Sequence, residues 1–294
     1  MIPSVNFHLW EPCNMRCKFC FATFQDVKNT ILPKGHLPKE QAIEVVLQLA
    51  ELGFKKITFA GGEPTLCPWL QELIATAKTA GFTTMIVTNG SKLNDHFLSI
   101  NQQYLDWITV SIDSVDVDTN LSAGRAILGK EPLSPDYNTS LVDRIRQYGY
   151  GLKVNTVVHS KNYNNDMSGF ILHAKPARWK LFQVLPIKGQ NDLNIDSFKI
   201  PDAQFQVFID RHSALKNITC IVPENNNEMT GSYVMVDPAG RFYDNTIGQH
   251  TYSRPILEIG ARLAIQQMQY DFGKFVSRGG IYDWSTSAKN INHV

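Results

Sequence analysis

The stretch EPCNMRCKFC, residues 11–20, holds three of the five cysteines of this 294-residue chain. Cys13, Cys17 and Cys20 have the spacing C-x-x-x-C-x-x-C and follow an apolar run at residues 5–10 that predicts a strand. Cysteines crowded into so short a loop indicate metal or redox chemistry rather than a disulfide framework. The sequence therefore predicts a metal site directly after the first strand.

Two kinds of metal group could use these thiols. Structural zinc needs four protein ligands, so Cys67, Cys220 or His8 would have to complete the site. A [4Fe–4S] cluster bound by three thiolates instead leaves one iron open to an outside ligand. The cluster is the favoured interpretation because one loop supplies all three thiols, and the open iron predicts a reactive position.

Strands and helices alternate over the first 200 residues. Apolar runs predict strands at residues 5–10, 56–60, 83–88, 107–112, 152–158 and 178–184. Helical spacing predicts helices at residues 39–52, 68–80, 94–101, 140–148 and 166–174. Such units predict an α/β fold, a partial (β/α)6 barrel with parallel strands, whose ligands gather at the carboxyl ends of the strands.

The pattern changes near residue 200. A helix at residues 202–214 precedes a predicted hairpin, with strands at 232–236 and 241–243 around Asp237-Pro238-Ala239-Gly240. No linker or repeat interrupts the chain. We therefore predict a barrel over residues 1–200 and a C-terminal extension over residues 201–294 that packs on the barrel and completes its site.

Charge and hydropathy limit the classes of binding partner that the sequence predicts. The formal net charge is only +1, which gives no general reason to bind a nucleic-acid polymer or an anionic membrane. No apolar run approaches the length of a spanning helix, and no leader opens the sequence. These features predict a cytoplasmic protein whose cationic sites are local.

Gly61-Gly62-Glu63-Pro64 follows the second predicted strand. Glycines allow a close approach of the backbone to a ligand, and the Glu63 carboxylate could bind an ammonium group. Alone, the tetrapeptide is equally typical of a strand-to-helix turn. Its position at a carboxyl end, like that of the cysteines, favours a ligand site.

Cationic side chains share one face of two later strands. Lys153 and Asn155 alternate with apolar residues, as do Arg178 and Lys180 in the next strand, and Lys56 begins the second strand. Cations buried in a barrel need an anion, which predicts a phosphate-rich ligand. Ion pairs with Asp113 or Glu63 are the alternative.

A second phosphate feature lies near the C-terminus. In Arg278-Gly279-Gly280, successive backbone N–H groups could form an anion nest beside a guanidinium. A simple surface turn is the alternative, and the cations of the barrel favour the nest.

The cysteine spacing, with Phe19 before the last cysteine, and the later Gly-Gly-Glu-Pro resemble the radical S-adenosylmethionine superfamily. The segments KKITFAGGEPTL, PARWKLFQVLPIKGQN and SRGGIYDW resemble one of its families, viperin, in a likeness that runs from about residue 5 to residue 284. The resemblance implies a [4Fe–4S] cluster, whose open iron binds S-adenosylmethionine and whose electron cleaves it to a 5′-deoxyadenosyl radical.

The resemblance also implies a reaction. Viperin-like enzymes are antiviral and convert a ribonucleoside triphosphate into its 3′-deoxy-3′,4′-didehydro analogue. The radical takes the hydrogen from C4′, the 3′-hydroxyl leaves as water, and one electron plus a proton complete the product. CTP or UTP is slightly favoured as substrate, GTP is possible, and a flavodoxin or ferredoxin would donate electrons.

The resemblance implies roles for those residues of this sequence that match the family's motifs. The cluster would be bound by Cys13, Cys17 and Cys20, and S-adenosylmethionine would be surrounded by Phe19, Gly61, Gly62, Glu63, Asn89, Ser111 and Arg125. The triphosphate would be held by Lys56, Lys153, Asn155, Arg178, Lys180 and Arg278. Tyr233 would assist late proton or hydrogen delivery, with a buried hairpin aromatic as the alternative.

The sequence departs from animal viperins in three places. It begins almost at the first strand, which suggests a prokaryotic type without the N-terminal membrane helix. Ala60 replaces a serine, and residues 244–254 carry His250 in place of a Lys- and Arg-rich stretch, which leaves the base preference open.

Two rival functions remain. Another radical S-adenosylmethionine enzyme acting on a phosphorylated nucleotide, such as the molybdenum-cofactor synthase, would need a second cysteine cluster, yet only Cys220 lies in the C-terminal part. The second rival is a non-enzymatic interaction protein that is stabilised by a bound metal.

Overall fold

One ten-stranded sheet organises the computed structural model, which describes residues 2–284. The strand order is β10-β9-β8-β1-β2-β3-β4-β5-β6-β7. Neighbouring strands are parallel from β8 through β7, and β9 runs antiparallel to both of its neighbours, β8 and β10. The bounds of the strands are β1 Ser4–Trp10, β2 Lys56–Gly61, β3 Thr83–Thr88, β4 Trp107–Ser111, β5 Gly151–Val158, β6 Arg178–Gln183, β7 Cys220–Glu224, β8 Val234–Val236, β9 Arg241–Asp244 and β10 Thr251–Pro255.

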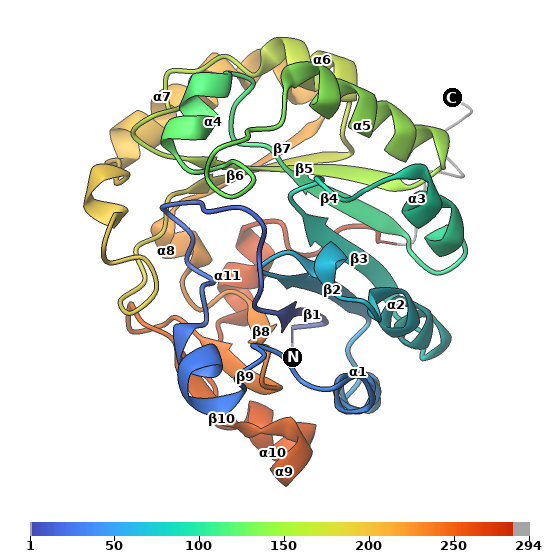
Figure 1. The fold of residues 1–294 in the computed structure, drawn as a ribbon. Helices are drawn as coiled ribbons and strands as arrows, with labels where there is room; N and C mark the ends of the chain where they lie inside the picture. The colour runs from blue at the N-terminus through green and yellow to red at the C-terminus, as the bar shows by residue number, and fades with distance from the viewer. Residues whose placement is uncertain (1, 285–294) are drawn as a thin grey trace.

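Helices cover the outer face of the curved sheet (Figure 1). They are α1 Lys39–Glu51, α2 Leu70–Thr79, α3 Asp95–Asn101, α5 Pro135–Gln147, α6 Ser168–Ala174 and α7 Asp202–Arg211. The shorter helices are α4 Val117–Ser122, α8 Asn226–Met229, α9 Ile256–Ile259, α10 Ala261–Ile265 and α11 Phe272–Ser277. The predicted partial (β/α)6 barrel is confirmed, with all six strands and their parallel order as expected.

Two helix boundaries differ from the prediction by three residues or more. Helix α5 begins at Pro135, five residues early, because the Ser134 side chain accepts a hydrogen bond from the Tyr137 N–H at 3.1 Å and caps it. Helix α7 ends at Arg211, and a separate 3-10 turn, Ser213–Asn217, follows. The sequence pattern had merged this turn with the helix.

The core lies between the sheet and its helices. Leu152, Val154, Trp179 and Leu181, on the outward faces of β5 and β6, are buried there. Burial of each such side chain stabilises the fold by roughly 1.5–3 kcal/mol. Because successive side chains alternate, their neighbours Lys153, Asn155 and Lys180 must face the concave side of the sheet.

The C-terminal extension joins the same sheet at both edges. Strand β7 pairs with β6, β8 pairs with β1, and β8 and β9 form the predicted hairpin. Residues from the extension therefore reach the concave face from two sides. The division of the chain at residue 200 stays a prediction.

Candidate active site

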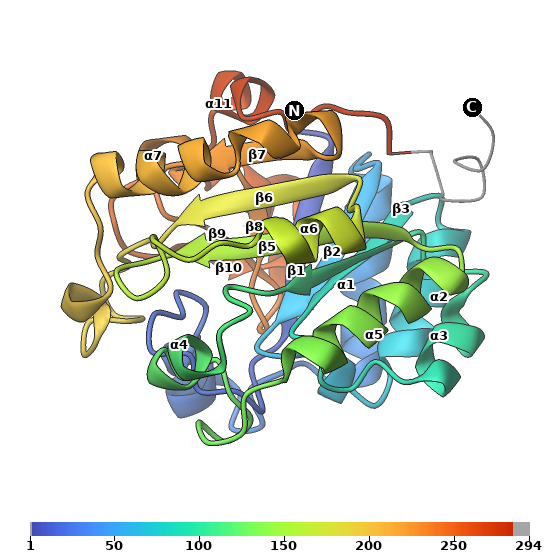
Figure 2. The same cartoon turned by 90° about the horizontal axis from the view of Figure 1, so that it is seen from above.

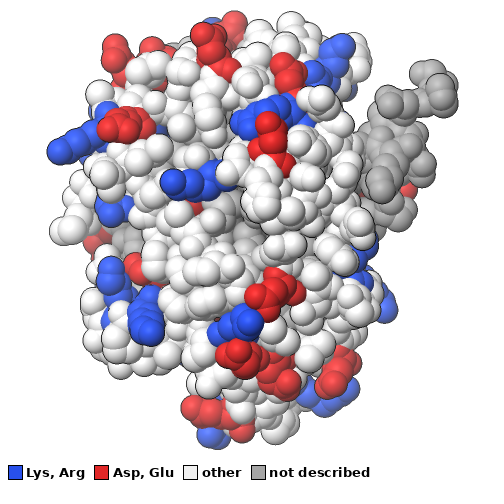
Figure 3. Space-filling view, turned by 45° about the vertical axis from the view of Figure 1, so that its right-hand side comes forward, with Lys and Arg blue, Asp and Glu red and all other residues white. Residues whose placement is uncertain are grey.

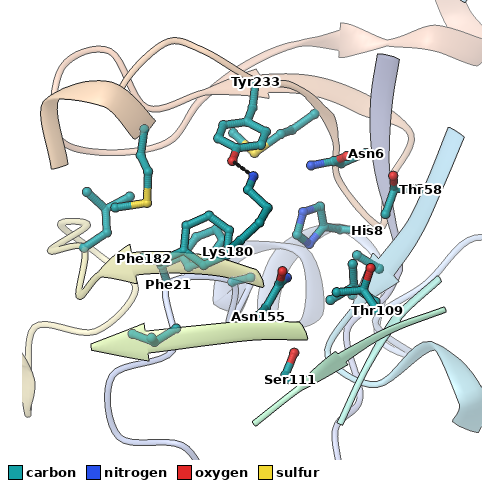
Figure 4. A pocket seen from close by; sticks show the side chains of 18 of the residues that line it. Asn6, His8, Phe21, Thr58, Thr109, Ser111, Asn155, Lys180, Phe182 and Tyr233 are labelled. Carbon is teal, nitrogen blue, oxygen red and sulfur yellow. Dashed lines mark hydrogen bonds between the residues drawn. The ribbon is translucent and has the colours of Figure 1, made fainter. Parts of the chain in front are cut away.

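The concave face of the sheet surrounds a cavity of about 310 Å³. We call this space the lumen. Its wall includes side chains from β1, β2, β4, β5 and β6, among them Asn6, Thr58, Ser111, Asn155 and Lys180 (Figure 4). The three cysteines of the loop at residues 11–20, the cysteine loop, line the same cavity.

The turn that follows α4 holds the cysteine loop in place. The Arg16 N–H donates to the Gly124 carbonyl at 3.2 Å, and the Lys18 N–H donates to the Ala123 carbonyl at 3.0 Å. A Cβ on Gly124 would lie 2.1 Å from the Arg16 carbonyl oxygen, and its φ of +73° also favours glycine. Side chains of the loop add to these backbone contacts: Arg16 Nη1 donates to the Cys13 carbonyl at 2.6 Å, and Lys18 Nζ donates to the Ser122 carbonyl at 2.9 Å.

The cysteine thiols fit a group that supplies positive charge. Burial raises the pKa of Cys13 to about 11 and that of Cys17 to about 12, and it raises the pKa of Cys20 as well. The Arg125 guanidinium opposes this rise in pKa at all three thiols. Iron bound to the sulfurs would keep them as thiolates, so the donor set suits an iron–sulfur cluster.

The three candidates for a fourth zinc ligand lie in different places. Within residues 2–284, no three or more His, Cys, Asp or Glu side chains, the loop cysteines included, are grouped so as to hold a single metal ion. Cys67 is buried, and exposed Cys220 begins β7, where its sulfur lies 3.8 Å from Arg178 Nη1. Neither lines the lumen, whereas His8 does.

Gly61 and Gly62 are required by the protein's own backbone. A Cβ on Gly62 would lie 2.0 Å from the Glu11 carbonyl oxygen, and one on Gly61 would lie 2.3 Å from that of Trp10. The Gly62 and Glu63 N–H groups donate to Trp10 and Pro12 at 2.5 and 2.9 Å. The sequence attributed the glycines to close approach of a cofactor, but the structure shows close approach of β2 to the cysteine loop.

Glu63 is fixed by four hydrogen bonds beneath this turn. Its carboxylate accepts from the Thr65 N–H at 3.0 Å, the Thr65 and Thr88 hydroxyls at 2.5 and 2.7 Å, and the Asn89 N–H at 2.7 Å. Burial raises the pKa of Glu63, and these hydrogen bonds oppose the rise. Glu63 and Asn89 line the lumen together with Ser111.

Arg125 lies beside both Phe19 and the thiols. Its guanidinium pairs with Asp113 at 2.5 Å and lies 5.7 Å from the centre of the Phe19 ring. The Asp113 carboxylate and the nearby thiols raise the pKa of Arg125, so this side chain stays charged. All seven residues predicted to surround S-adenosylmethionine line one wall of the lumen, next to the cysteines.

The predicted phosphate ligands also face the lumen. Lys153 is paired with Arg178, and Asn155 with Lys180, in the register of β5 and β6. The two layers lie roughly 6.6 Å apart along the strands. Together with Lys56 and Arg278, three of these residues form what we call the cation cluster: Lys56, Lys153, Arg178, Lys180 and Arg278.

The cation cluster corrects one expectation. Lys56 and Arg178 are the first residues of β2 and β6, so the cluster lies toward the amino ends of the strands. The cysteine loop and the Gly-Gly-Glu-Pro turn lie at the carboxyl ends of β1 and β2, where the sequence placed the ligand site, but the predicted phosphate ligands do not share this position. A ligand that reaches both groups would have to extend along the lumen.

A carboxylate missed in the sequence partly neutralises the cluster. Glu224, the last residue of β7, lies 2.5 Å from Lys180 Nζ and 3.4 Å from Arg278 Nη1. Asp113 and Glu63 pair with neither, so the expected alternative partners were wrong. These cations lower the pKa of Glu224 despite its burial. Among residues 2–284, Lys56, Lys153 and Arg178 form no ion pair.

The two buried lysines of β2 and β5 are poorly compensated. Burial lowers the pKa of Lys56 and of Lys153 well below the usual lysine value. Repulsion from Arg178 and Lys180 lowers both pKa values further. Such a site favours an anionic ligand, because a phosphate group would stabilise the charged lysines.

Tyr233 lies within the cation cluster. Its hydroxyl accepts from Lys180 at 2.7 Å (Figure 4) and donates to the Glu224 carboxylate. Arg278 stacks on its ring at 3.7 Å. Burial raises its pKa well above the usual tyrosine value. The hydroxyl is therefore a protonated member of a Lys-Tyr-Glu chain.

The expected anion nest at Arg278-Gly279-Gly280 was wrong. The Gly279 N–H donates to Val276 and the Gly280 N–H to Phe275, both at 2.9 Å, so these groups close the end of α11. Arg278 itself lines the lumen as predicted.

Several lumen residues were missed in the sequence. They are Asn6, Phe21, Asn245 and Tyr282. His8, considered in the sequence only as a zinc ligand, lines the lumen as well. Glu224 was also missed; it pairs with the lumen residue Lys180. His250, noted only as a departure from animal relatives, also faces the lumen and is neutral, since burial lowers its pKa to about 4. Pairing across distant strands brings these residues together, which no local pattern reveals.

The sequence matches the family described as "Radical SAM superfamily" over residues 10–172. A protein of Flammeovirga pacifica named "S-adenosylmethionine-dependent nucleotide dehydratase" is 58% identical over 284 residues, which cover 97% of each chain. The chain belongs to the nucleotide dehydratase family of radical S-adenosylmethionine enzymes. This result confirms the resemblance to viperin and the cofactor pair of a [4Fe–4S] cluster and S-adenosylmethionine.

Other members of the nucleotide dehydratase family are similar along most of this chain. One from Lacinutrix mariniflava with the same name is 62% identical over 286 residues, which are 97% of this chain and 60% of that protein. The chain thus spans three-fifths of that relative. The RSAD2 protein of Oncorhynchus mykiss, also named as a nucleotide dehydratase, is 37% identical over 96% of this chain and 80% of its own.

Solved structures confirm the fold. Streptococcus suis SuiB bound to S-adenosylmethionine has a TM-score of 0.68 at 15% identity, over 94% of this chain and 68% of SuiB. A structure of anSMEcpe with bound S-adenosylmethionine also has a TM-score of 0.68, at 14% identity, over 90% of this chain and 80% of its own. Within residues 2–284, no helix is long and apolar enough to cross a membrane.

Proposed function

We propose that this chain dehydrates a ribonucleoside triphosphate to its 3′-deoxy-3′,4′-didehydro analogue, beginning with loss of hydrogen from C4′. The observation that carries the proposal is the polarity of the lumen. Cysteines line it beside the Gly-Gly-Glu-Pro turn, and the cation cluster lines it toward the amino ends of the strands. A nucleoside triphosphate is an elongated ligand with a matching polarity, because its charge is concentrated in the phosphates.

The chain's own residues divide between two tasks. Cys13, Cys17 and Cys20 would hold the cluster, and Phe19, Gly61, Gly62, Glu63, Asn89, Ser111 and Arg125 would surround S-adenosylmethionine. When bound, this cofactor pair supplies a carbon radical that abstracts a hydrogen atom. The residues around it exclude water and fix the position of the sugar, so that one ribose hydrogen is within reach.

The triphosphate would be bound by the cation cluster and Asn155. The Asn155 Oδ1 atom is buried and has no hydrogen-bond partner within residues 2–284. A hydroxyl or bound water of a nucleotide could satisfy it. Arg178 and Arg278 offer bidentate contacts to phosphate, whereas the lysines offer point charges.

Tyr233 would complete the reaction as the late donor of a proton or hydrogen atom. Its hydroxyl joins Lys180 to Glu224, so a proton lost from the oxygen could be replaced through this chain. CTP or UTP remains slightly favoured over GTP, and a flavodoxin or ferredoxin would supply the electron. An antiviral role and a cytoplasmic location stay predictions.

The test is anaerobic reconstitution of the cluster and incubation with dithionite, S-adenosylmethionine and each of ATP, CTP, GTP and UTP. We expect one triphosphate to raise 5′-deoxyadenosine above background and to yield a nucleotide lighter by one water. A Cys17→Ala enzyme is the control and should form neither product. If no triphosphate stimulates cleavage, the substrate assignment is wrong; if a phosphorylated nucleotide gives another product, the rival enzyme class is favoured.

The phosphate ligands are tested separately. Arg178→Ala and Lys180→Ala should each weaken binding of the active triphosphate by about tenfold or more, since each removes a charge-assisted contact. Iron and sulfide content should remain unchanged. The matched control is Arg254→Ala, because the Arg254 side chain lies on the surface and pairs with Glu258. Unchanged binding in the lumen variants would contradict the assignment.

A further inference from the structure

The chain after α11 passes over the amino ends of the central strands. In Figure 2, β6 points to the left and this segment runs along the opposite, upper right side. Tyr282 extends from it into the lumen and lines the cavity together with Gly279 and Gly280. Its aromatic ring therefore lies at the end of the lumen where the cation cluster is concentrated.

Tyr282 contacts three members of the cation cluster. Its hydroxyl accepts hydrogen bonds from Lys56 Nζ, at 3.3 Å, and from Lys153 Nζ. Its ring centre lies 4.1 Å from Arg178 Cζ and 4.3 Å from Lys153 Nζ. Burial raises the pKa of Tyr282 to about 12, so the hydroxyl keeps its hydrogen. That hydrogen has no acceptor in the described part of the chain.

The segment that carries Tyr282 is attached to the sheet on both sides of this residue. Arg178 Nη2 donates to the Gly279 carbonyl at 2.8 Å, and Trp107 Nε1 donates to the Trp284 carbonyl at 3.0 Å. Lys56 Nζ lies 5.1 Å from the Trp284 ring. These contacts hold Tyr282 in one place at the end of the lumen, so it can serve as a fixed boundary.

Because Tyr282 is fixed, a ligand that is held at the cofactor by its other end can contact Tyr282 only if it has the right length. The reacting sugar must lie next to the cofactor, and β5 and β6 set the distance from there to Tyr282. A chain of phosphates that is one unit short would leave Lys56, Lys153 and the Tyr282 hydroxyl without an anionic partner. Unpaired buried polar groups of this kind give strong discrimination.

We propose that Tyr282 determines how many phosphates the nucleotide carries: its hydroxyl donates to the terminal phosphate and holds Lys56 and Lys153 within reach of it. The inference rests on the proposed nucleotide substrate. It adds Tyr282, which is not one of the residues assigned above to phosphate binding, as a residue that determines specificity. Tyr282 acts in positioning, since it lies at the far end of the lumen from the cysteines.

The test compares triphosphate, diphosphate and monophosphate forms of the active nucleoside. Dissociation constants are measured by calorimetry on the reconstituted enzyme, and KM and kcat by product formation. For Tyr282→Phe, the preference for triphosphate over diphosphate should fall about tenfold, the effect of one charge-assisted hydrogen bond. KM should rise while kcat changes less than about twofold, because the sugar still reaches the cofactor.

Tyr163→Phe is the matched control. Tyr163 lies outside the lumen and packs, partly buried, against the hydrophobic core. This variant should keep the wild-type preference. A second arm uses the wild-type enzyme alone: a methyl ester on the terminal phosphate of the active triphosphate should weaken binding about tenfold, because the fixed ring leaves no room beyond that phosphate.

The outcomes separate the two proposals. If the wild-type enzyme binds no nucleoside triphosphate, the proposed function fails. If it prefers the triphosphate and the Tyr282→Phe enzyme keeps the same preference, Tyr282 is not the determinant. Equal binding of the methyl ester and its parent by the wild-type enzyme would overturn the inference even if the Tyr282→Phe protein did not fold.

Discussion

Glu224 lies between two cations and a tyrosine that belong to three different parts of the chain. It pairs with Lys180 of β6 and with Arg278 after α11, and it accepts the hydroxyl hydrogen of Tyr233. Its negative charge stabilises the cluster when no anionic ligand is bound. In the proposed complex, the same charge would repel a phosphate group, so Glu224 would limit nucleotide affinity while it orients Tyr233.

Glu224→Gln should separate these two effects. We expect the active triphosphate to bind about tenfold tighter, because the repulsion is removed, and kcat to fall, because Tyr233 loses a carboxylate acceptor. Calorimetry and product formation measure the two quantities. Glu258→Gln, a surface control, should change neither. Weaker binding in the Glu224→Gln enzyme would mean that Glu224 chiefly holds the cations in position.

At the scale of elements, the end of β2 and the cysteine loop form one backbone unit. Gly61 and Gly62 contact Trp10, Glu11 and Pro12 so closely that neither position has space for a side chain. The hydrogen bonds from Gly62 and Glu63 complete the contact. The two motifs of the sequence, separated by 40 residues, therefore depend on each other for their shape.

Gly62→Ala should damage both motifs. The added methyl group would lie 2.0 Å from the Glu11 carbonyl oxygen, so we expect the free energy of unfolding to fall by about 3 kcal/mol. Urea denaturation of the cluster-free protein measures this, and iron content after reconstitution should also fall. Gly169→Ala is the control: nothing lies within 4 Å of its Cβ in α6, so stability should change by about 1 kcal/mol at most. Equal effects of the two substitutions would contradict the close-contact account.

The sequence predicted the elements better than it predicted their partners. Period-two alternation placed Lys153, Asn155 and Lys180 on the lumen face correctly, because strand geometry is local. Glu224 and Tyr282 could not be found in this way. Glu224 reaches Lys180 only because β7 pairs with β6, and Tyr282 reaches Lys56 across 226 residues. The nest at Arg278 failed because its N–H groups were needed to end a helix.

At the scale of the molecule, a cluster of five positive charges lies inside, apart from the mixed charges of the surface. The face in Figure 3 carries basic and acidic side chains interspersed, in keeping with the net charge of +1. The cation cluster, by contrast, lies within the sheet, with Lys56 and Lys153 buried. Such an arrangement suits a small anion that enters the lumen better than a polymer that binds along the surface.

This concentration of charge predicts how nucleotide affinity depends on pH. Burial and mutual repulsion lower the pKa of Lys56 and Lys153, and burial lowers the pKa of Lys180 to about 8, so part of each population loses its proton as the pH rises toward the usual lysine value. A phosphate group favours the charged form and raises these pKa values. The complex therefore binds more protons than the free enzyme, and affinity must fall as the pH rises.

Triphosphate affinity measured by calorimetry from about pH 7 to pH 9 should show this decline, since the terminal phosphate, with a pKa near 6, is already ionised. Buffers of different ionisation enthalpy should reveal proton uptake on binding. Tyr282 does not contribute, because burial raises its pKa to about 12. Lys153→Arg is the matched variant: arginine stays charged, so its affinity should depend less steeply on pH. Constant affinity without proton uptake in the wild-type enzyme would mean that Lys56, Lys153 and Lys180 are already fully charged before the nucleotide binds.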